Sequence, residues 1–344
     1  MGDDRKLMRV LVLGGTRFIG RRLVELLAAR EHEVVVFSRD ELSPPLPGPV
    51  KAVRGERADR TALERLFSGG GYDCVVDNIA YGSAAVSELA ALGGDRIGRY
   101  VLMSTAWVYA VLPPEVGRVF AENDLRPGSI SLPYRAVAVR GLPDLTRRYI
   151  AEKIAAEAAA FQMEVPVTIL RPAMVSGRID HNDRIGFYVR RVMDGGPVLL
   201  LEGGGQPFHL LWVDDLARSM VGLIEADCPR RSVFNIAPSE RVSTAEIVSL
   251  IEEGLGRSVE KVSRSTAVLE KEYPEYESYE PFAATIKDRY DSTEVLSLLP
   301  EFRFTAPDCW IKECVRRLAA DRPGGKESNQ RRREREAAKA DRRS

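Results

Sequence analysis

The sequence predicts an α/β fold in which a parallel sheet carries helices on both faces. Three observations lead to this prediction. First, short apolar runs alternate with helical patterns along the first half of the chain. Second, each run is apolar at consecutive residues, without polar residues at every second position. Third, a glycine-rich turn follows the first run. Continuous apolar runs are typical of strands buried on both faces, and strand–helix alternation predicts right-handed crossovers between parallel strands.

Composition places the chain among soluble globular proteins. Of its 344 residues, 44% are hydrophobic and 29% are charged, and 50 basic residues balance 50 acidic ones. Zero net charge gives no overall field for nucleic acid or a membrane surface, so we expect neither as a partner. No targeting segment is recognised, and a cytoplasmic location is expected. Four scattered cysteines and three histidines indicate neither a disulfide framework nor a metal site.

The first strand is expected at Met8–Leu13, and it runs directly into the turn Gly14-Gly15-Thr16-Arg17-Phe18-Ile19-Gly20. A helical pattern follows from Arg21 to Ala29. The backbone N–H groups at the start of such a helix, with the helix dipole behind them, favour a pyrophosphate. Strand, turn and helix together predict a nucleotide-binding loop.

The second strand, expected at Glu33–Phe37, ends in Ser38 and Arg39. An acidic residue at this place would bond to the ribose hydroxyls of NAD, whereas a small polar residue followed by arginine leaves room and charge for the phosphate of NADP. NADP is therefore the preferred cofactor and NAD the alternative. Asp40 and Glu41 adjoin Arg39, so a solvated loop residue is the other interpretation of this arginine.

Thr105 follows the strand expected at Arg99–Met103. Ligands of open parallel sheets bind beyond the carboxyl ends of the strands, which places Thr105 where the nucleotide is expected. The other expected strands of the first sheet and the helix among them are Val50–Val53, Thr61–Phe67 (helix), Tyr72–Val76 and Val165–Ala173.

A segment without proline or glycine, from Leu145 to Val165, predicts a helix that carries Tyr149, Lys153 and Glu157. Residues four apart lie on the same face of a helix. An ammonium beside a phenol favours the phenolate, so Tyr149 and Lys153 together suit a general acid or base that works near neutral pH. The spacing alone is common on ordinary amphipathic helices.

The remaining chain predicts more α/β structure. Asp214 and Asp215 open a helix to Ala226, where a helix-terminal role is preferred to acid–base chemistry. Residues 270–281 are expected to form a loop, and 321–344 a disordered charged tail for which RNA or partner binding is a minor alternative. The other elements expected are strands at Pro197–Glu202, Ser232–Ile236 and Val259–Val262, a helix from the Ser243–Glu246 capping box to Leu255, and helices from Asp291 and from Asp308 to Leu318.

Five motifs make the chain resemble the extended short-chain dehydrogenase/reductases, the NAD(P)-dependent epimerase/dehydratase-like proteins. They are Gly14-Gly15-Thr16-Arg17-Phe18-Ile19-Gly20, Ser104-Thr105-Ala106-x-Val108-Tyr109, Tyr149-x-x-x-Lys153-x-x-x-Glu157, Leu170-Arg171-Pro172 and Trp212-Val213-Asp214-Asp215-Leu216-Ala217. The resemblance covers about Met8 to Leu318. It implies a doubly wound Rossmann domain in residues 1–175, with elements from about 205–237, and an interleaved α/β substrate-binding part in 176–320.

The resemblance also implies the roles of the site residues. Tyr149 would exchange a proton with a hydroxyl or carbonyl, Lys153 would lower the Tyr pKa and hold the nicotinamide ribose, and Thr105 would orient the reacting oxygen. A small-molecule substrate and a homodimer are expected. The implied cofactor-binding residues are Gly14, Gly15, Thr16, Arg17, Phe18, Ile19, Gly20, Ser38, Arg39, Glu56, Arg57, Ile79, Ala80, Lys153 and Pro172, and the candidate substrate residues are Ser104, Ala106, Met174, Arg178 and His181.

Departures from the family pattern narrow the chemistry. Arg17 stands where the family has its middle glycine, and its guanidinium can bind a phosphate. Ala106 and Trp107 replace the acids that 4,6-dehydratases and nucleotide-sugar decarboxylases use, which argues against both reactions. Met174 replaces an asparagine that sugar-nucleotide epimerases carry after the Leu-Arg strand, and Phe208 replaces the arginine that holds their diphosphate. A segment between Pro127 and Asp144 is extra, either a lid or a surface insertion.

The sequence therefore predicts an NADP-preferring oxidoreductase or epimerase that interconverts a secondary alcohol and a ketone on a sugar-like or nucleotide-linked substrate. One alternative is an NADPH-dependent carbonyl reductase of a non-sugar metabolite. Another is a non-catalytic nucleotide- or RNA-binding protein, because the glycine loop also resembles that of chloroplast stem-loop RNA-binding proteins. The intact pair of Tyr149 and Lys153 counts against this last alternative, as does the absence of a basic stripe.

Overall fold

The computed structural model describes residues 6–42, 48–113, 115, 117–130, 144–272, 281–282, 288–321 and 329–339. The chain divides into two compact units. The first comprises Met1–Ala173, Val213–Ala237 and Asp288–Arg303, and the second Met174–Trp212, Pro238–Lys287 and Phe304–Ser344.

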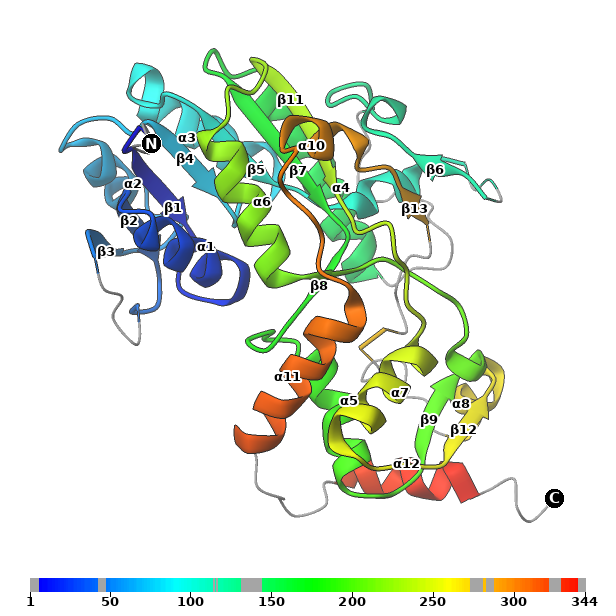
Figure 1. The fold of residues 1–344 in the computed structure, drawn as a ribbon. Helices are drawn as coiled ribbons and strands as arrows, with labels where there is room; N and C mark the ends of the chain where they lie inside the picture. Colours follow the sequence, from blue (N-terminus) through cyan, green and yellow to red (C-terminus); the bar gives the residue numbers. More distant parts are fainter. Residues whose placement is uncertain are drawn as a thin grey trace. The chain divides into compact units, whose positions relative to one another are not determined.

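The first unit is built on a seven-stranded parallel sheet (Figure 1) with the order β11-β7-β5-β4-β1-β2-β3. The predicted parallel α/β fold is confirmed. Connections run outward from β1 to β3 and then return to β4 on the other side of β1, so the winding reverses between β1 and β4. The strands are β1 Arg9–Leu13, β2 Glu33–Ser38, β3 Val50–Arg54, β4 Cys74–Asp77, β5 Tyr100–Met103, β7 Val167–Pro172 and β11 Arg231–Ile236.

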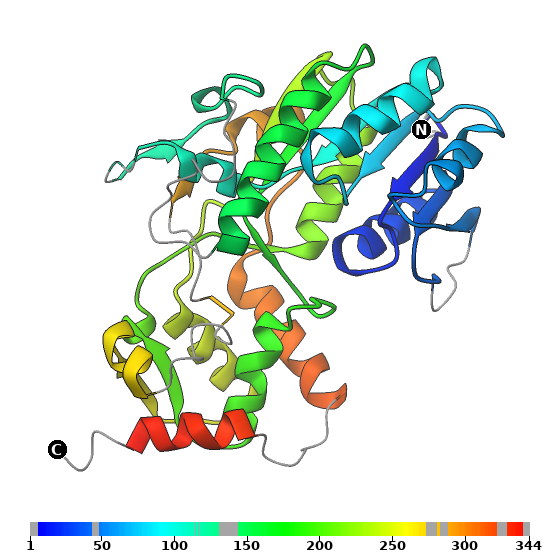
Figure 2. The ribbon, with the colours of Figure 1, turned by 180° about the vertical axis from the view of Figure 1, so that it is seen from behind.

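Helices cover both faces of this sheet. Helix α1 packs against α6 on one face, and α3 packs against α2 and α4 on the other. Figure 2, seen from behind, brings α3 and α4 to the front, in cyan and green. The central strands β1, β2, β4 and β5 are apolar and buried over most of their length, which is why strands buried on both faces form here. The helices are α1 Phe18–Ala29, α2 Arg60–Phe67, α3 Gly82–Gly93, α4 Asp144–Phe161 and α6 Val213–Glu225.

Shorter elements complete the first unit. They are the 3₁₀ turns η1 Gly94–Arg96, η2 Ala106–Val111 and η3 Glu122–Asp124, the parallel pair β6 Val119–Phe120 and β13 Arg289–Tyr290, and helix α10 Thr293–Leu298. Of the segment predicted as a lid or insertion, residues 131–143 lie outside the described part of the chain.

The second unit contains two small parallel pairs and five helices among its described residues. Helix α11 packs against α5 and α7. The predicted capping box is confirmed at α7, where the Ser243 hydroxyl accepts from the Glu246 N–H at 3.2 Å and the Glu246 carboxylate accepts from the Ser243 N–H at 2.7 Å. The elements are β8 Met174–Ser176 with β10 Leu210–Trp212, β9 Val198–Leu201 with β12 Lys261–Arg264, α5 Arg184–Met193, η5 Glu202–Gly204, α7 Thr244–Leu255, α8 Thr266–Glu272, α11 Pro307–Asp321 and α12 Asn329–Lys339.

Helix α12 corrects the prediction of a disordered tail over 321–344, which is wrong for residues 329–339. The charged residues that suggested a solvated tail form ion pairs with the rest of the second unit: Arg331 Nε lies 2.6 Å from the Asp194 carboxylate, and the buried Glu334 accepts from Arg191 of α5 at 2.8 Å. A paired charge stabilises folded structure where an unpaired one would not. Helix α8 likewise shows that the loop predicted over 270–281 is helical at 270–272, and 273–280 lie outside the described residues.

None of the helices in the described part of the chain is long and apolar enough to cross a membrane.

Candidate active site

The glycine turn lies at the carboxyl end of β1, beside the point where the winding reverses. Gly14 has φ +80°, and its N–H donates to Phe37 O at 2.8 Å. A Cβ on Gly20 would lie 1.9 Å from Gly14 O, so only glycine allows α1 to begin this close to the turn. The first turn of α1 is thereby placed where a doubly wound sheet binds its nucleotide.

Arg17 and Phe18 lie in the bend between the glycines. Arg17 has an extended backbone and precedes the first residue of α1. Phe18, which is not glycine, adopts φ +41°, a left-handed conformation that stores strain and occurs preferentially at functional sites. The Arg17 guanidinium lies 3.0 Å from the Asp40 carboxylate just beyond β2.

The ends of β2 and β3 carry a group of arginines next to this bend. Arg54 Nε donates to Arg39 O at 3.1 Å, and both residues are exposed. The Ser38 hydroxyl donates to Asp40 O at 2.5 Å. Arg17, Arg39 and Arg54 thus provide positive charge at the predicted adenosine end of the site, where Asp40 pairs with Arg17.

Two side chains near the glycine turn have buried polar atoms without partners. These are Nε and Nη1 of Arg57 and both amide atoms of Asn78, among the residues that the structure describes. The remaining Arg57 nitrogen donates to the fully buried Asp77 at 3.1 Å and to Ala85 O at 2.6 Å. Native proteins rarely leave buried polar atoms unpaired, so these groups fit a polar ligand such as a dinucleotide.

Lys153 is almost completely buried at the carboxyl ends of β4 and β5. Its Nζ donates to Met103 O at 2.8 Å and to Ala80 O at 3.0 Å. Burial lowers the pKa of Lys153 to about 8, and the negative charges of Asp77, Glu157 and Glu152 oppose this decrease. Lys153 is therefore mostly protonated at neutral pH, and it loses its proton at a lower pH than an exposed lysine does.

Tyr149 lies one helical turn before Lys153, with its ring centroid 5.9 Å from the ammonium nitrogen. Aromatic rings flank it: the Trp107 ring is 6.3 Å away edge-on, and the Tyr81 ring is 6.1 Å away. Thr105 is buried at the start of η2, and its hydroxyl oxygen accepts from the Trp107 N–H at 3.3 Å. Tyr149 and Lys153 thus lie together near the end of β5. Trp107 contacts both Thr105, through its N–H, and the Tyr149 ring.

Glu157, Arg171 and Tyr109 occupy the remaining family motifs and form a buried network beneath the site. Arg171 Nε lies 2.9 Å from Oε1 of Glu157 and its Nη2 lies 2.6 Å from Oε2, a bidentate ion pair with both side chains buried. Arg171 Nη1 also donates to the Tyr109 hydroxyl at 2.9 Å. The Ser104 hydroxyl donates to Glu157 at 2.5 Å, so this predicted substrate residue is committed to the network. These motif residues fix α4 against β5 and β7.

The other predicted substrate residues belong to both units. Ala106 is buried at the start of η2 in the first unit. Met174 is buried in β8 of the second unit, whereas Arg178 and His181 are exposed there. Phe208 is fully buried against the ring of Phe282 at 5.1 Å, so this residue supplies no polar contact at the place where the resemblance implies an arginine.

The remaining predicted residues lie in the first unit. Pro172 is the last residue of β7, Ile79 and Ala80 follow β4, and Glu56 is exposed after β3. Asp214 and Asp215 lie in the first turn of α6 as predicted, and their carboxylates pair with Arg22, at 2.8 Å, and Arg218.

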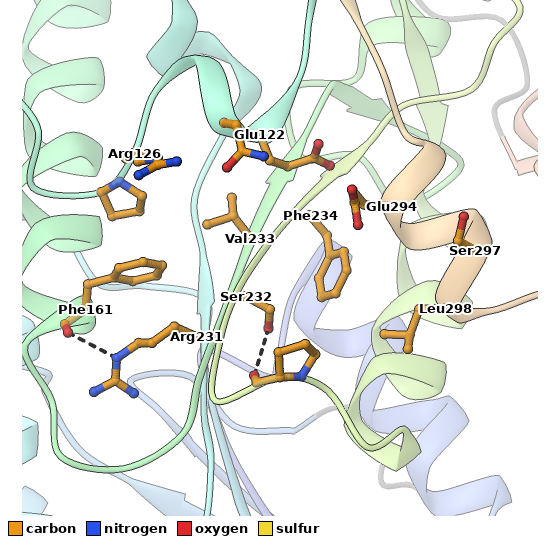
Figure 3. Close-up of a pocket in the computed structure, with 13 residues that line it drawn as sticks. Glu122, Arg126, Phe161, Arg231, Ser232, Val233, Phe234, Glu294, Ser297 and Leu298 are labelled. Atoms are coloured by element: carbon orange, nitrogen blue, oxygen red, sulfur yellow. Dashed lines mark hydrogen bonds between the residues drawn. The ribbon is translucent and has the colours of Figure 1, made fainter.

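A separate hollow of about 640 Å³ runs along β11, the edge strand of the sheet (Figure 3). Arg231 and Phe161 lie on one side of it and Glu294, Ser297 and Leu298 on the other. The Arg231 guanidinium is already bonded to main-chain carbonyls at the end of α4, including Val165 O at 2.6 Å. None of the predicted site residues lines this hollow, so it is distinct from the candidate active site.

A parallel sheet with a glycine loop at its switch point and a Tyr–Lys pair beyond β5 defines an enzyme of the extended short-chain dehydrogenase/reductase class. The model of the NAD dependent epimerase/dehydratase family matches residues 10–237, and the chain belongs to this family.

Known relatives include reductases, epimerases and a binding protein. The 2'-dehydrokanamycin reductase of Streptomyces kanamyceticus is 27% identical over 260 residues, 74% of this chain and 69% of that protein. The chloroplast stem-loop binding protein of 41 kDa b of Arabidopsis thaliana is 25% identical over 68% of this chain and 60% of its own length. A solved UDP-glucose 4-epimerase from Thermotoga maritima has the same fold, with a TM-score of 0.69 at 18% identity over 91% of this chain and 99% of the other.

Proposed function

We propose that this protein is an NADP-dependent oxidoreductase that interconverts a secondary alcohol and a ketone, with Tyr149, Lys153 and Thr105 as its catalytic residues. One observation carries the proposal: the ammonium of Lys153 is buried, oriented by two main-chain carbonyls and adjacent to Tyr149. A buried lysine without such a role is rarely retained, because desolvating its charge is unfavourable.

Each catalytic side chain has a task that its surroundings support. The Lys153 ammonium favours the phenolate of Tyr149, which can then take the proton of a substrate hydroxyl or, when protonated, donate one to a carbonyl. The Thr105 hydroxyl, whose oxygen accepts the Trp107 N–H, retains its proton for donation to the reacting oxygen. Two of the three Lys153 N–H groups bond to protein carbonyls, and the third is assigned to the nicotinamide ribose.

The residues around the glycine turn fit a dinucleotide. The turn and the start of α1 would hold the pyrophosphate, and the unpartnered atoms of Arg57 and Asn78 would bond to the adenosine half. When bound, the nicotinamide supplies or accepts the hydride. Arg17, Arg39 and Arg54 favour the extra phosphate of NADP over the bare ribose of NAD.

The substrate is proposed to be sugar-like without a nucleotide diphosphate. Phe208 is packed into an aromatic cluster of the second unit, and Met174 is buried, so neither supplies the polar contacts of a diphosphate. The relative named as 2'-dehydrokanamycin reductase is consistent with such a substrate. Reduction and epimerisation use the same three residues.

The nucleotide content of the purified protein tests the proposal and separates these two outcomes. We expect an empty protein that binds NADPH reversibly, which is the behaviour of a reductase that uses cofactor as co-substrate. A nucleotide released only on denaturation would indicate an epimerase, which regenerates its cofactor in each turnover. A protein that binds neither NAD(H) nor NADP(H) would overturn the proposal in favour of a non-catalytic role.

Replacing Arg39 by Gln is expected to weaken NADPH binding by about tenfold to a hundredfold, the size of one lost charge-assisted hydrogen bond. NADH binding should change by less than about threefold, because NADH lacks the phosphate. Fluorescence titration of both nucleotides measures the two affinities. Arg60→Gln, at an exposed arginine of α2 paired with Glu64, is the matched control. An equal loss for NADH and NADPH would contradict the assignment of Arg39 to the phosphate.

A further inference from the structure

Tyr81 is an aromatic residue at the candidate active site whose role the family motifs do not assign. It directly follows Ala80, whose carbonyl accepts from Lys153, and it immediately precedes α3. Its ring centroid lies 4.4 Å from the Lys153 ammonium nitrogen, closer than that of Tyr149 at 5.9 Å. Half of Tyr81 is exposed, so core packing alone does not explain its place.

We propose that Tyr81 is a positioning residue that keeps Lys153 protonated, with its ring face lying over the buried ammonium. The negative face of an aromatic ring attracts a cation within about 6 Å of the centroid, and the attraction is stronger when the cation is desolvated. Lys153 is such a cation, since 2% of it is exposed.

The carboxylates around Lys153 do not by themselves offset the effect of burial on its ammonium. Asp77 at the end of β4 and Glu152 and Glu157 on α4 raise the pKa of Lys153, but burial outweighs them. Glu157 is already paired with Arg171 and Asp77 with Arg57, so part of their field is neutralised. The ammonium donates to the Met103 carbonyl after β5 and to the Ala80 carbonyl after β4, and both are neutral groups. On the α3 side it lies over the Tyr81 ring, and the Tyr149 ring is farther away at 5.9 Å.

Tyr81 acts as a neutral ring and not as a phenolate. Burial raises the pKa of its phenol, and the negative charges of Glu152 and Asp77 raise it further. The hydroxyl is therefore dispensable for this role and the aromatic face is not. This separates two substitutions at one position: Tyr81→Phe keeps the ring face, and Tyr81→Leu removes it while leaving an apolar side chain.

The titration of Lys153 itself tests the proposal without substrate or cofactor. The lysine ε-carbons are labelled with ¹³C, and the Lys153 signal is assigned from its absence in a Lys153→Met protein. We expect the Lys153 pKa to fall by about one pH unit in Tyr81→Leu and to stay at the wild-type value in Tyr81→Phe. A Tyr81→Met protein repeats the test with an unbranched side chain.

Two results would overturn the role of Tyr81. An unchanged Lys153 pKa in Tyr81→Leu would show that the ring face does not act on the ammonium. A raised pKa would show that Tyr81 acts only by keeping water out, since hydration stabilises the charged form.

The consequence for turnover rests on the proposed function. Activity that needs protonated Lys153 is lost as pH rises through its pKa, so Tyr81→Leu should move the basic limb of kcat/KM to lower pH by about one unit while Tyr81→Phe leaves it in place. An NMR shift in a protein without turnover would refute the proposed function and leave the inference standing. If the Tyr81→Leu protein turned over substrate with the basic limb of its kcat/KM profile at the wild-type pH, the role of Tyr81 would be refuted and the proposed function would stand.

Discussion

Turnover of the Tyr149→Phe protein is expected to fall by about 10²–10⁴-fold, while its affinity for NADPH stays within about threefold of the wild type. The substitution removes the one hydroxyl that exchanges a proton with the substrate oxygen. It keeps the ring that packs between Tyr81 and Trp107, and it leaves Lys153 on its two carbonyls. Steady-state rates with NADPH and a set of ketones, together with fluorescence titration of the nucleotide, measure the two effects.

Tyr72→Phe is the matched control for that experiment. Its hydroxyl is buried and donates to Leu66 O at 2.8 Å near the amino end of β4, whereas the candidate active site lies at the carboxyl ends of the strands. We expect this protein to retain wild-type turnover and to lose at most about 1–2 kcal/mol of stability with the hydrogen bond. Comparable activity in Tyr149→Phe and Tyr72→Phe would show that Tyr149 is not the acid or base.

The parts of the site that follow directly after buried strands were predictable from the sequence. Every strand predicted in the first half of the chain is found within two residues of its predicted bounds, because continuous apolar runs between glycines and polar turns have few other solutions. The parallel order of those strands then places the glycine turn and Thr105 at one edge of the sheet. Tyr149 and Lys153 were singled out by their helical spacing together with the other family motifs, and their catalytic role stays a prediction.

Other parts depend on contacts between distant segments, which local patterns do not encode. Glu157 and Arg171 were seen as motif members, but their bidentate pairing is set by how α4 crosses β7. Tyr81 was missed because an aromatic residue after a strand usually indicates packing. Its one available signal was its position directly beyond β4, where ligands bind. The helix at 329–339 was missed because its charged residues find partners elsewhere in the second unit: Glu334 pairs with Arg191 on α5, and Arg331 pairs with Asp194 in the turn after α5.

The Glu157→Gln protein is expected to be less stable than the wild type by about 3–5 kcal/mol, because the substitution leaves the Arg171 charge buried without its counterion. Arg171 is fully buried, so solvent does not compensate for the lost counterion. Urea unfolding measures the change in free energy. The double variant Glu157→Gln with Arg171→Met should recover part of the loss, since it removes the orphaned charge along with its partner.

An exposed ion pair of the same domain provides the control. Glu64→Gln breaks the pair with Arg60 on α2, which should change stability by less than about 0.5 kcal/mol because both charges are solvated. If Glu157→Gln lost no more stability than Glu64→Gln, the buried network would not be what fixes α4.

The comparison with Tyr149→Phe distinguishes the catalytic residue of this helical motif from its structural residue. Tyr149→Phe should lose turnover and keep stability, whereas Glu157→Gln should lose stability and keep more turnover per folded molecule than Tyr149→Phe, since Glu157 contacts the framework and not the reacting oxygen.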